Sequence, residues 1–534
     1  MNVRRYQKWA KSGLAIMLAG AMMVGTAASS GGMTAQAAET ESSDTVSTQK
    51  AVTSDAASLL FTEKHITSDL TLPTIGASGT TISWKSSNPS VLSNEGKVTR
   101  PKKGAADEEV TLEGTVKIGD YAKTRKFSFV VLAESEMGPT KEFALDQVEL
   151  LDDYYLTAQN SDIEFLKKFD NDRLLSRFRE TAGLDTKGIA PYGGWEDGWL
   201  GGHSVGHYLT AIAQAVKATG NADLKEKSKQ LIEGLAECQN KLGTGFIFGA
   251  KIETEGYVEK QFDILEGKTT GKTWVPWYNM HKMLTGLVDT YKYTGNKQAL
   301  EVAKKLGDWI YNRVSKWDAG TQGRVLGTEY GGMNDCLYEL YLCTRDSKHL
   351  EAAHKFDEPN LYKTVAKGGK NCLNGKHANT TIPKFLGALK RYVVLEQTGE
   401  LTKDDEAYLT NVEKFFDIAV TRHAYITGGV SVMEHFRKDN NQDGTRTQTN
   451  CESCCAHNML KMAKELYKVT GDKKYADYYE TTLRNSIMGA VKSESGAAAY
   501  FIPMATGYFK TFGNEDPAKN MFWCCTGSGM ENFT

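Results

Sequence analysis

A helix-ending signature that recurs five times constrains the fold more than any other feature of the 534-residue chain. In each copy an amphipathic stretch stops at glycine or an equivalent residue, and asparagine or aspartate follows as the cap of another helix. The copies begin at Ala218, Tyr293, Cys343, Gln397 and Val469. Each unit is a helical hairpin, so the pattern predicts at least five hairpins in succession.

Two further stretches extend this series of hairpins. A helix expected over residues 162–182 and the start of another at Thr526 would bring the total to about six hairpins. Six hairpins predict an (α/α)6 barrel, so we expect a mainly α domain over residues 141–534. An open helical solenoid is the alternative, and the uneven spacing of the copies argues against it.

The first 38 residues have the pattern of a signal peptide. Basic residues precede an apolar stretch, and Ala35–Ala37 has the small-x-small form that signal peptidase cuts. A retained N-terminal anchor is the alternative. No other stretch is apolar enough to cross a bilayer, so we expect no membrane insertion after removal of the signal. The chain is therefore predicted to be secreted by a bacterium or held at its cell surface.

A small β domain is expected between the signal and the helices. Residues 39–55 are polar and rich in Ser and Thr, which predicts a flexible linker. Residues 56–134 consist of short alternating runs separated by turn signals, which predicts an all-β sandwich. The segment resembles the bacterial immunoglobulin-like modules of exported carbohydrate-active proteins. It could bind sugar or cell wall, or serve only as a spacer.

The cysteines indicate a metal site. Exported proteins usually oxidise their cysteines in pairs, yet this chain has nine. Adjacent cysteines such as Cys524 and Cys525 are hard to bridge to each other. With Glu452 and Cys454 they offer three thiolates and one carboxylate, a set suited to tetrahedral Zn²⁺. A metal-bound thiolate stays deprotonated and can act as a nucleophile. A purely structural zinc is the alternative.

Polar side chains precede each expected inner helix. In a ring of parallel helices these ends gather round one mouth, where carboxylates, amides and aromatic rings suit a sugar. Any single histidine could instead be a satisfied core group. The net charge of −2 gives no reason to expect a nucleic-acid partner. The residues considered for the mouth include His203, His207, Trp274, His281, Glu329, Asn334 and His377.

Five segments carry a resemblance to a known family. They resemble the β-L-arabinofuranosidases of glycoside hydrolase families 127 and 146, and family 146 more closely. The resemblance implies an (α/α)6 barrel and a retaining hydrolase that releases β-L-arabinofuranose from plant cell-wall or glycoprotein arabinosides. The segments are PYGGWEDGWLGGHSVGHYLTA, LGTEYGGMNDCLYELY, YITGGVSVMEHF, TNCESCCAHNMLK and FWCCTGSGMEN.

The resemblance also implies roles for particular residues. Cys524 matches the nucleophile, a cysteine bound to zinc, and Glu434 matches the general acid/base. The other zinc ligands and the residues at the sugar pocket follow from the same motifs. Glu452, Cys454 and Cys525 match the remaining ligands, His281 and His377 match pocket histidines, and His203, His207 and Asn334 are proposed because they share the rim.

The family continues beyond the CC motif, whereas this sequence ends at Thr534, so we expect a C-terminally truncated barrel. Two other functions are considered. One is a different α/α-barrel glycosidase or a lyase. The other is a non-catalytic cell-surface carbohydrate-binding protein with a vestigial barrel. The presence of both Glu434 and Cys524 favours an enzyme.

Overall fold

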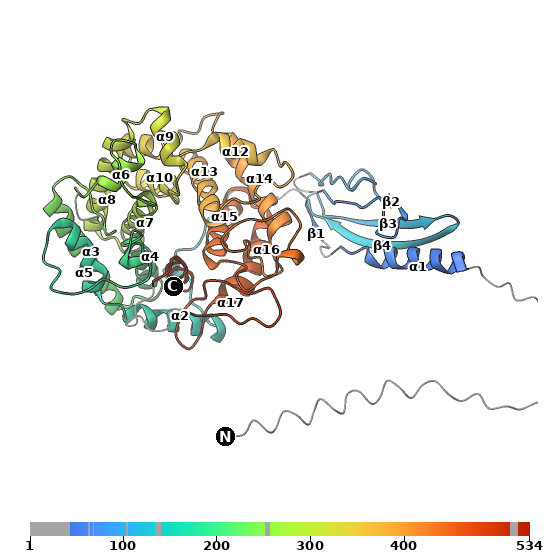
Figure 1. Ribbon diagram of the computed structural model, residues 1–534, viewed down its shortest axis with the longest axis horizontal. Helices are drawn as coiled ribbons and strands as arrows, with labels where there is room; N and C mark the ends of the chain where they lie inside the picture. Colours follow the sequence, from blue (N-terminus) through green and yellow to red (C-terminus); the bar gives the residue numbers. More distant parts are fainter. Residues whose placement is uncertain are drawn as a thin grey trace, which may run out of the picture. The chain divides into compact units, whose positions relative to one another are not determined.

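The computed structural model describes residues 43–61, 65–67, 69–102, 105–133, 140–250, 257–512 and 522–534. The described residues form two compact units (Figure 1), the smaller of which comprises those from Ser43 to Thr99 together with Asp107–Leu132. The predicted signal peptide lies outside the described residues. Within those residues, no helix combines the length and the apolar character needed to span a membrane.

The small unit contains one four-stranded sheet with the strand order β1-β4-β3-β2. β3 and β4 form a long hairpin in which Ile118 pairs with Tyr121 across the Gly-Asp turn. β2 is antiparallel to β3, and β1 is parallel to β4. The strands are β1 His65–Ile66, β2 Thr81–Ser86, β3 Glu108–Ile118 and β4 Tyr121–Val131.

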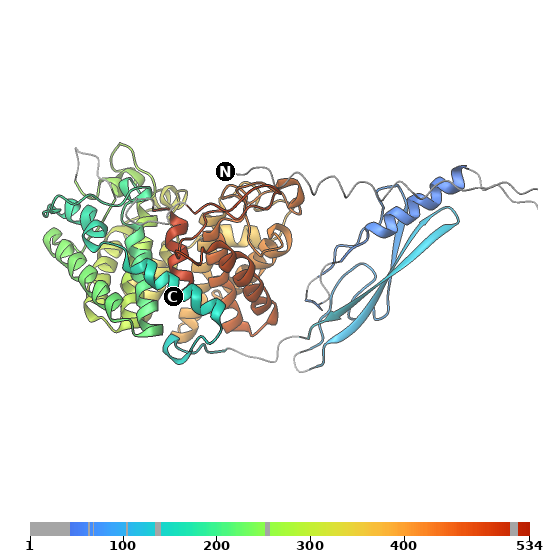
Figure 2. The ribbon, with the colours of Figure 1, turned by 90° about the horizontal axis from the view of Figure 1, so that it is seen from below.

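Helix α1, Ser43–Ser58, runs along this sheet (Figure 2). Its Val52 and Ala56 are buried in one core with Trp84 of β2, and the Arg125 guanidinium of β4 donates to the Ala56 carbonyl (3.1 Å). The structure thus differs from the flexible linker expected over residues 39–55. The packing of Val52 and Ala56 and the contact of Arg125 with the helix end stabilise α1 despite its polar composition, because tertiary packing overrides local propensity. It also differs from a two-sheet sandwich, since a helix packs against the single sheet.

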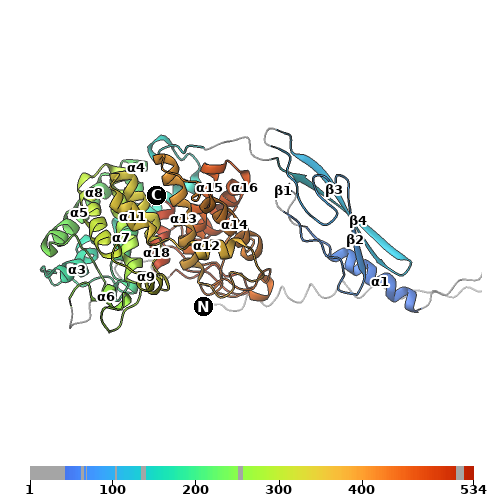
Figure 3. The same cartoon turned by 90° about the horizontal axis from the view of Figure 1, so that it is seen from above.

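Six inner helices form a closed ring in the large unit. Each contacts the next along the chain, and α18 contacts both α15 and α4. Figure 3 shows α18 in the middle of this unit. The expected barrel fold is confirmed, and the ring is closed by a helix that starts at the CC motif. The inner helices are α4 His203–Thr219, α7 Pro276–Thr294, α10 Met333–Thr344, α13 Ala378–Thr398, α15 Ser453–Thr470 and α18 Cys524–Asn532.

The recurring signature lies at the turns between inner and outer helices. Four inner helices end at a glycine in the left-handed conformation, and Arg345 takes that conformation after α10. Asn or Asp side chains then cap α5, α8, α11 and α16. The outer helices are α3 Asn171–Ala182, α5 Ala222–Leu242, α8 Lys297–Val314, α11 Ser347–His354, α14 Glu406–His423 and α16 Lys473–Thr482.

The helix expected over residues 162–182 is two helices. Asp170 has an extended backbone and accepts from the N–H groups of Asp172 and Arg173, so it ends the first helix and caps the second. The first of these two helices is α2, Asp153–Lys167, and the second is α3. Short helices lie in the connections of the ring. They are α6 Lys260–Leu265, α9 Ala319–Leu326, α12 Pro359–Ala366 and α17 Met488–Ala490.

Candidate active site

Four side chains that can ligate a metal meet where α15 and α18 begin. One ligand atom from each of Glu452, Cys454, Cys524 and Cys525 lies within 4.8 Å of all the others, and all four residues are buried. Glu452 Oε1 is 3.9 Å from Cys524 Sγ and 3.7 Å from Cys525 Sγ. The Sγ atoms of Cys454 and Cys525 are 3.0 Å apart, and every cysteine in the structure is free. The predicted ligand set is therefore brought together.

The donor set fits a tetrahedral metal ion. Metal–sulfur bonds of about 2.3 Å imply ligand separations of about 3.8 Å, close to the two distances to Glu452 and to the 4.0 Å between Cys524 and Cys525. The 3.0 Å contact is shorter and would have to open. Burial raises the pKa of Glu452, Cys454 and Cys525, and a divalent cation would offset this penalty on their charged forms.

Backbone pairing anchors the start of each helix to a neighbouring segment. Glu452 bridges to Phe501, and the Ser453 N–H donates to the Tyr500 carbonyl at 3.0 Å. On the other side, the Trp195 N–H donates to the Phe522 carbonyl at 2.8 Å. The thiols lie at the N-termini of α15 and α18, where the backbone N–H groups that lack partners within the helix favour negative charge.

Glu434 projects from a loop with strained backbone. Ser431, Met433 and Glu434 all have positive φ, and the value at Glu434 is 65°. The loop is held in place because the Ala378 N–H, in the first turn of α13, donates to the Glu434 carbonyl at 2.6 Å. Left-handed backbone at three non-glycine positions costs free energy and is typical of functional loops.

The Glu434 carboxylate lies between two donors. The Tyr500 hydroxyl donates to Oε1, and His377 Nε2 is 3.5 Å from Oε2. The same Tyr500 oxygen is 3.5 Å from Cys524 Sγ. One tyrosine thus connects the predicted acid and the predicted nucleophile.

The electrostatics of this pair are coupled. The hydrogen bond from His377 lowers the pKa of Glu434. Burial opposes the charged form of His377, but the hydrogen bond to Glu434 and the negative charges of Glu329, Glu434 and Cys524 together outweigh it, so the pKa of His377 is raised. The pair therefore holds a proton at higher pH than an isolated carboxyl group would.

His203 also faces the cluster. Its Nδ1 lies 2.8 Å from Glu196 Oε1 and 2.6 Å from the Leu200 carbonyl oxygen. The ring is fully buried, and Nε2 has no hydrogen-bond partner within the described part of the chain. Hydrogen bonds from Cys454 and Cys525 lower the pKa of the Cys524 thiol, and His203 lies within electrostatic range of the same thiol.

Three predicted rim residues are engaged between helices instead. His207 Nδ1 pairs with Glu531 of α18, the Gly332 N–H donates to His281 Nδ1 at 3.0 Å, and Asn334 Nδ2 donates to Asp357 at 3.0 Å. These contacts join inner helices or join one inner helix to the connection after it. The structure therefore gives His207, His281 and Asn334 partners in helix packing.

Tyr500 was not singled out from the sequence, and Glu329 was considered only as one of the polar residues that precede an inner helix. Tyr500 lies in an irregular segment between α17 and α18, where no periodic pattern marks it. Glu329, before α10, interacts with His377, Glu434 and Cys524, and burial raises its pKa. Its position just before an inner helix was the available signal.

Comparison with known proteins identifies the family. The model of the β-L-arabinofuranosidase GH127 catalytic domain matches residues 147–534, well over half of the chain.

The chain belongs to this family.

A second model, the atrophied bacterial Ig domain, matches residues 37–134. That match includes α1, in agreement with its packing on the sheet. The matched catalytic model is that of GH127, and the closer likeness to family 146 stays a prediction.

Solved structures share the fold of the GH127 domain. One GH127 β-arabinofuranosidase has 18% identity and a TM-score of 0.53, with 74% of this chain and 60% of that chain covered. Ara127N-Se, a GH127 β-L-arabinofuranosidase from Geobacillus stearothermophilus T6, has 17% identity and a TM-score of 0.51, with 72% and 64% covered. The chain thus spans less than two thirds of the length of these relatives. No curated protein matches.

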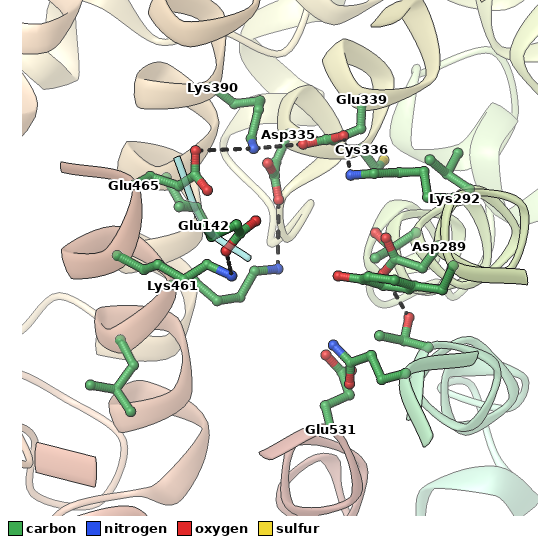
Figure 4. A pocket seen from close by; sticks show the side chains of 18 of the residues that line it. Glu142, Asp289, Lys292, Asp335, Cys336, Glu339, Lys390, Lys461, Glu465 and Glu531 are labelled. Carbon is green, nitrogen blue, oxygen red and sulfur yellow. Dashed lines mark hydrogen bonds and ion pairs between the residues drawn. The ribbon is translucent and has the colours of Figure 1, made fainter. Parts of the chain in front are cut away.

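One cavity of the GH127 domain lies away from the four residues of the cluster. It measures about 510 Å³ and is lined by later residues of the inner helices. Figure 4 shows its charged side chains pairing with one another. Glu339 accepts from Lys292 at 2.7 Å and from Lys390 at 2.6 Å, and Lys461 lies 3.8 Å from Asp335. None of the four cluster residues lines it, so the site is identified by its chemistry and not by cavity size.

Proposed function

We propose that this GH127 chain is a secreted retaining β-L-arabinofuranosidase in which Cys524, held by zinc, is the nucleophile. The observation that carries the proposal is the Tyr500 hydroxyl, which contacts both Glu434 and Cys524 while Cys524 belongs to the buried four-ligand cluster. A nucleophile and a proton donor on two sides of one small site are the requirement for retaining hydrolysis. The predicted signal peptide supports secretion, and the activity for which the family is named supports the arabinofuranoside substrate.

Three sulfur donors and one oxygen donor favour zinc. When bound, zinc would keep the Cys524 sulfur deprotonated and would accept negative charge as that sulfur departs.

The chain's own residues would act in two steps. In the first, Cys524 Sγ forms a bond to the anomeric carbon while the bond to the leaving oxygen breaks, and Glu434 gives that oxygen a proton. In the second, Glu434 takes a proton from water, the water oxygen bonds to the anomeric carbon, and the carbon–sulfur bond breaks. The lowered pKa of Glu434 suits its role as base, and His377 supplies the proton that its role as acid needs.

His203 and Tyr500 would orient the reactants. His203 Nε2 is free to pair with a sugar hydroxyl, and Glu196 fixes the ring. Tyr500 would fix the positions of the Glu434 and Cys524 side chains relative to each other, because its hydroxyl contacts both. The arabinose would come from plant cell-wall or glycoprotein arabinosides, since β-linked L-arabinofuranose occurs on such glycans.

The test is hydrolysis of methyl β-L-arabinofuranoside by the full chain, followed by proton NMR. We expect β-arabinofuranose as the first product, about one zinc per chain by metal analysis, and a loss of at least about 1,000-fold in kcat for Cys524→Ser. Cys343→Ser, on the later part of α10, is the matched control and should keep full activity. Undiminished turnover by Cys524→Ser, or the α-anomer as first product, would refute the mechanism.

A further inference from the structure

Three tryptophans that the mechanism does not use lie together beside the site. The ring centroids of Trp195 and Trp274 are 5.5 Å apart, and those of Trp195 and Trp523 are 5.4 Å apart. Trp274 is 43% exposed, and the other two are partly exposed. Together these residues are called the tryptophan platform.

The backbone fixes the platform at the start of α18. Trp523 directly precedes Cys524, and Gly194 bridges to Phe522. Gly194 has a φ of 70°, and a Cβ there would lie 2.6 Å from the Phe522 carbonyl oxygen. Only glycine allows this approach, so the chain conformation holds Trp195 against the segment that carries the thiols.

The inner side of the platform adjoins the wall of the site. Trp195 packs against Leu200, Val275 and Tyr278. Tyr278 in turn lies within electrostatic range of Cys524 and Cys454, and its ring centroid is 6.1 Å from that of His203. A ligand that extends from Cys524 past Tyr278 would therefore reach the indole rings.

Indole rings suit a neutral sugar ring. They present broad apolar faces, and the C–H groups on one face of a sugar pack against such surfaces while its hydroxyls stay in water. The three side chains bring no charge of their own to attract an ionic group. A partly exposed aromatic surface next to a polar site is typical of a binding surface and not of a buried core.

Building on the proposed function, we propose that the tryptophan platform binds the sugar ring of the leaving group, the residue to which the arabinofuranose is attached. The substrate class is then a di- or oligosaccharide with a terminal β-L-arabinofuranosyl residue, and not a simple alkyl arabinoside. Binding energy from this second ring would favour turnover of the extended substrate.

The experiment compares Trp274→Ala with the wild-type full chain on two substrates. One is methyl β-L-arabinofuranoside, whose leaving group has no ring, and the other is a disaccharide with a terminal β-L-arabinofuranosyl residue. We expect kcat/KM for the disaccharide to fall about five- to tenfold, and kcat/KM for the methyl glycoside to stay within about twofold. Trp274→Phe should recover part of the loss. Tyr154→Ala, which removes another exposed aromatic ring, is the control and should change neither value.

The outcomes separate this inference from the proposed function. An equal change on both substrates, or none on either, overturns the platform's role. If the wild-type chain hydrolyses neither substrate, the proposed function fails, and the platform is judged by disaccharide binding in calorimetry. Binding that Trp274→Ala weakens would then support the platform, and binding that it leaves unchanged, or no binding to the wild type, would overturn it.

Discussion

At the scale of single residues, His377 and Glu434 together determine the protonation state of the site. The pKa of His377 is raised and that of Glu434 is lowered, so one proton is shared by the pair over a range that extends above the usual histidine pKa of 6.5. A catalytic acid needs that proton. Activity should therefore fall as pH rises through the raised pKa of His377.

Replacing His377 should shift the pH at which activity falls on the alkaline side of the profile. In His377→Asn the proton can reside only on Glu434, a carboxyl group, so the limb of the kcat/KM profile should shift down by more than about one pH unit. The profile is measured with methyl β-L-arabinofuranoside, and His354→Asn on an outer helix is the control. An alkaline limb that stays in place in His377→Asn would exclude the shared proton.

The metal ligands could be predicted from the sequence. The distance of the other polar side chains from the thiols could not. The odd number of thiols and their adjacency in Cys524–Cys525 suggested a metal, and the donors do meet. His203 and His207 lie on the same face of α4, but the separation of four residues between their positions corresponds to about 6 Å along the helix axis. His203 therefore faces the thiols while His207 pairs with Glu531.

At the scale of helices, α4 and α7 pack so closely that only glycine fits at their crossing. A Cβ on Gly206 would lie 2.1 Å from the Lys282 carbonyl oxygen, and one on Gly286 would lie 2.5 Å from the Gly206 carbonyl oxygen. These atoms belong to backbone and cannot rotate away. The crossing holds His203 of α4 next to Tyr278 of α7.

We expect Gly206→Ala to lower the free energy of unfolding by about 2–3 kcal/mol, because the two helices must separate. Thermal unfolding of the full chain measures the change. Gly323→Ala in α9 is the control, since a Cβ there meets nothing within 4 Å, and it should be neutral or slightly stabilising. Equal melting temperatures for the two variants would contradict the close crossing.

Helix ends were more predictable than helix interactions. The capping residues mark the turns between inner and outer helices, because one residue fixes each turn through its own backbone or side chain. By contrast, α1 has little apolar character, and only its contact with the sheet explains why it is helical. The break at Asp170 shows the opposite case, a local cap within a stretch that reads as one helix.

At the scale of the whole molecule, one cluster ties together the two last inner helices of the ring. Glu452 and Cys454 come from the start of α15, and Cys524 and Cys525 from the start of α18. A ring of six helices could be predicted, because repeated hairpins have few other ways to bury their apolar faces. The position of Tyr500 could not, since it depends on how an irregular segment packs between the same two helices.

The most direct test of the account identifies the residue that bonds to the sugar. The full chain is incubated with an epoxide inhibitor of β-L-arabinofuranose configuration, digested and analysed by peptide mass spectrometry. The account predicts a single label on Cys524, absent from Cys524→Ser. A label on Glu434 or on another carboxylate in place of Cys524 would contradict it.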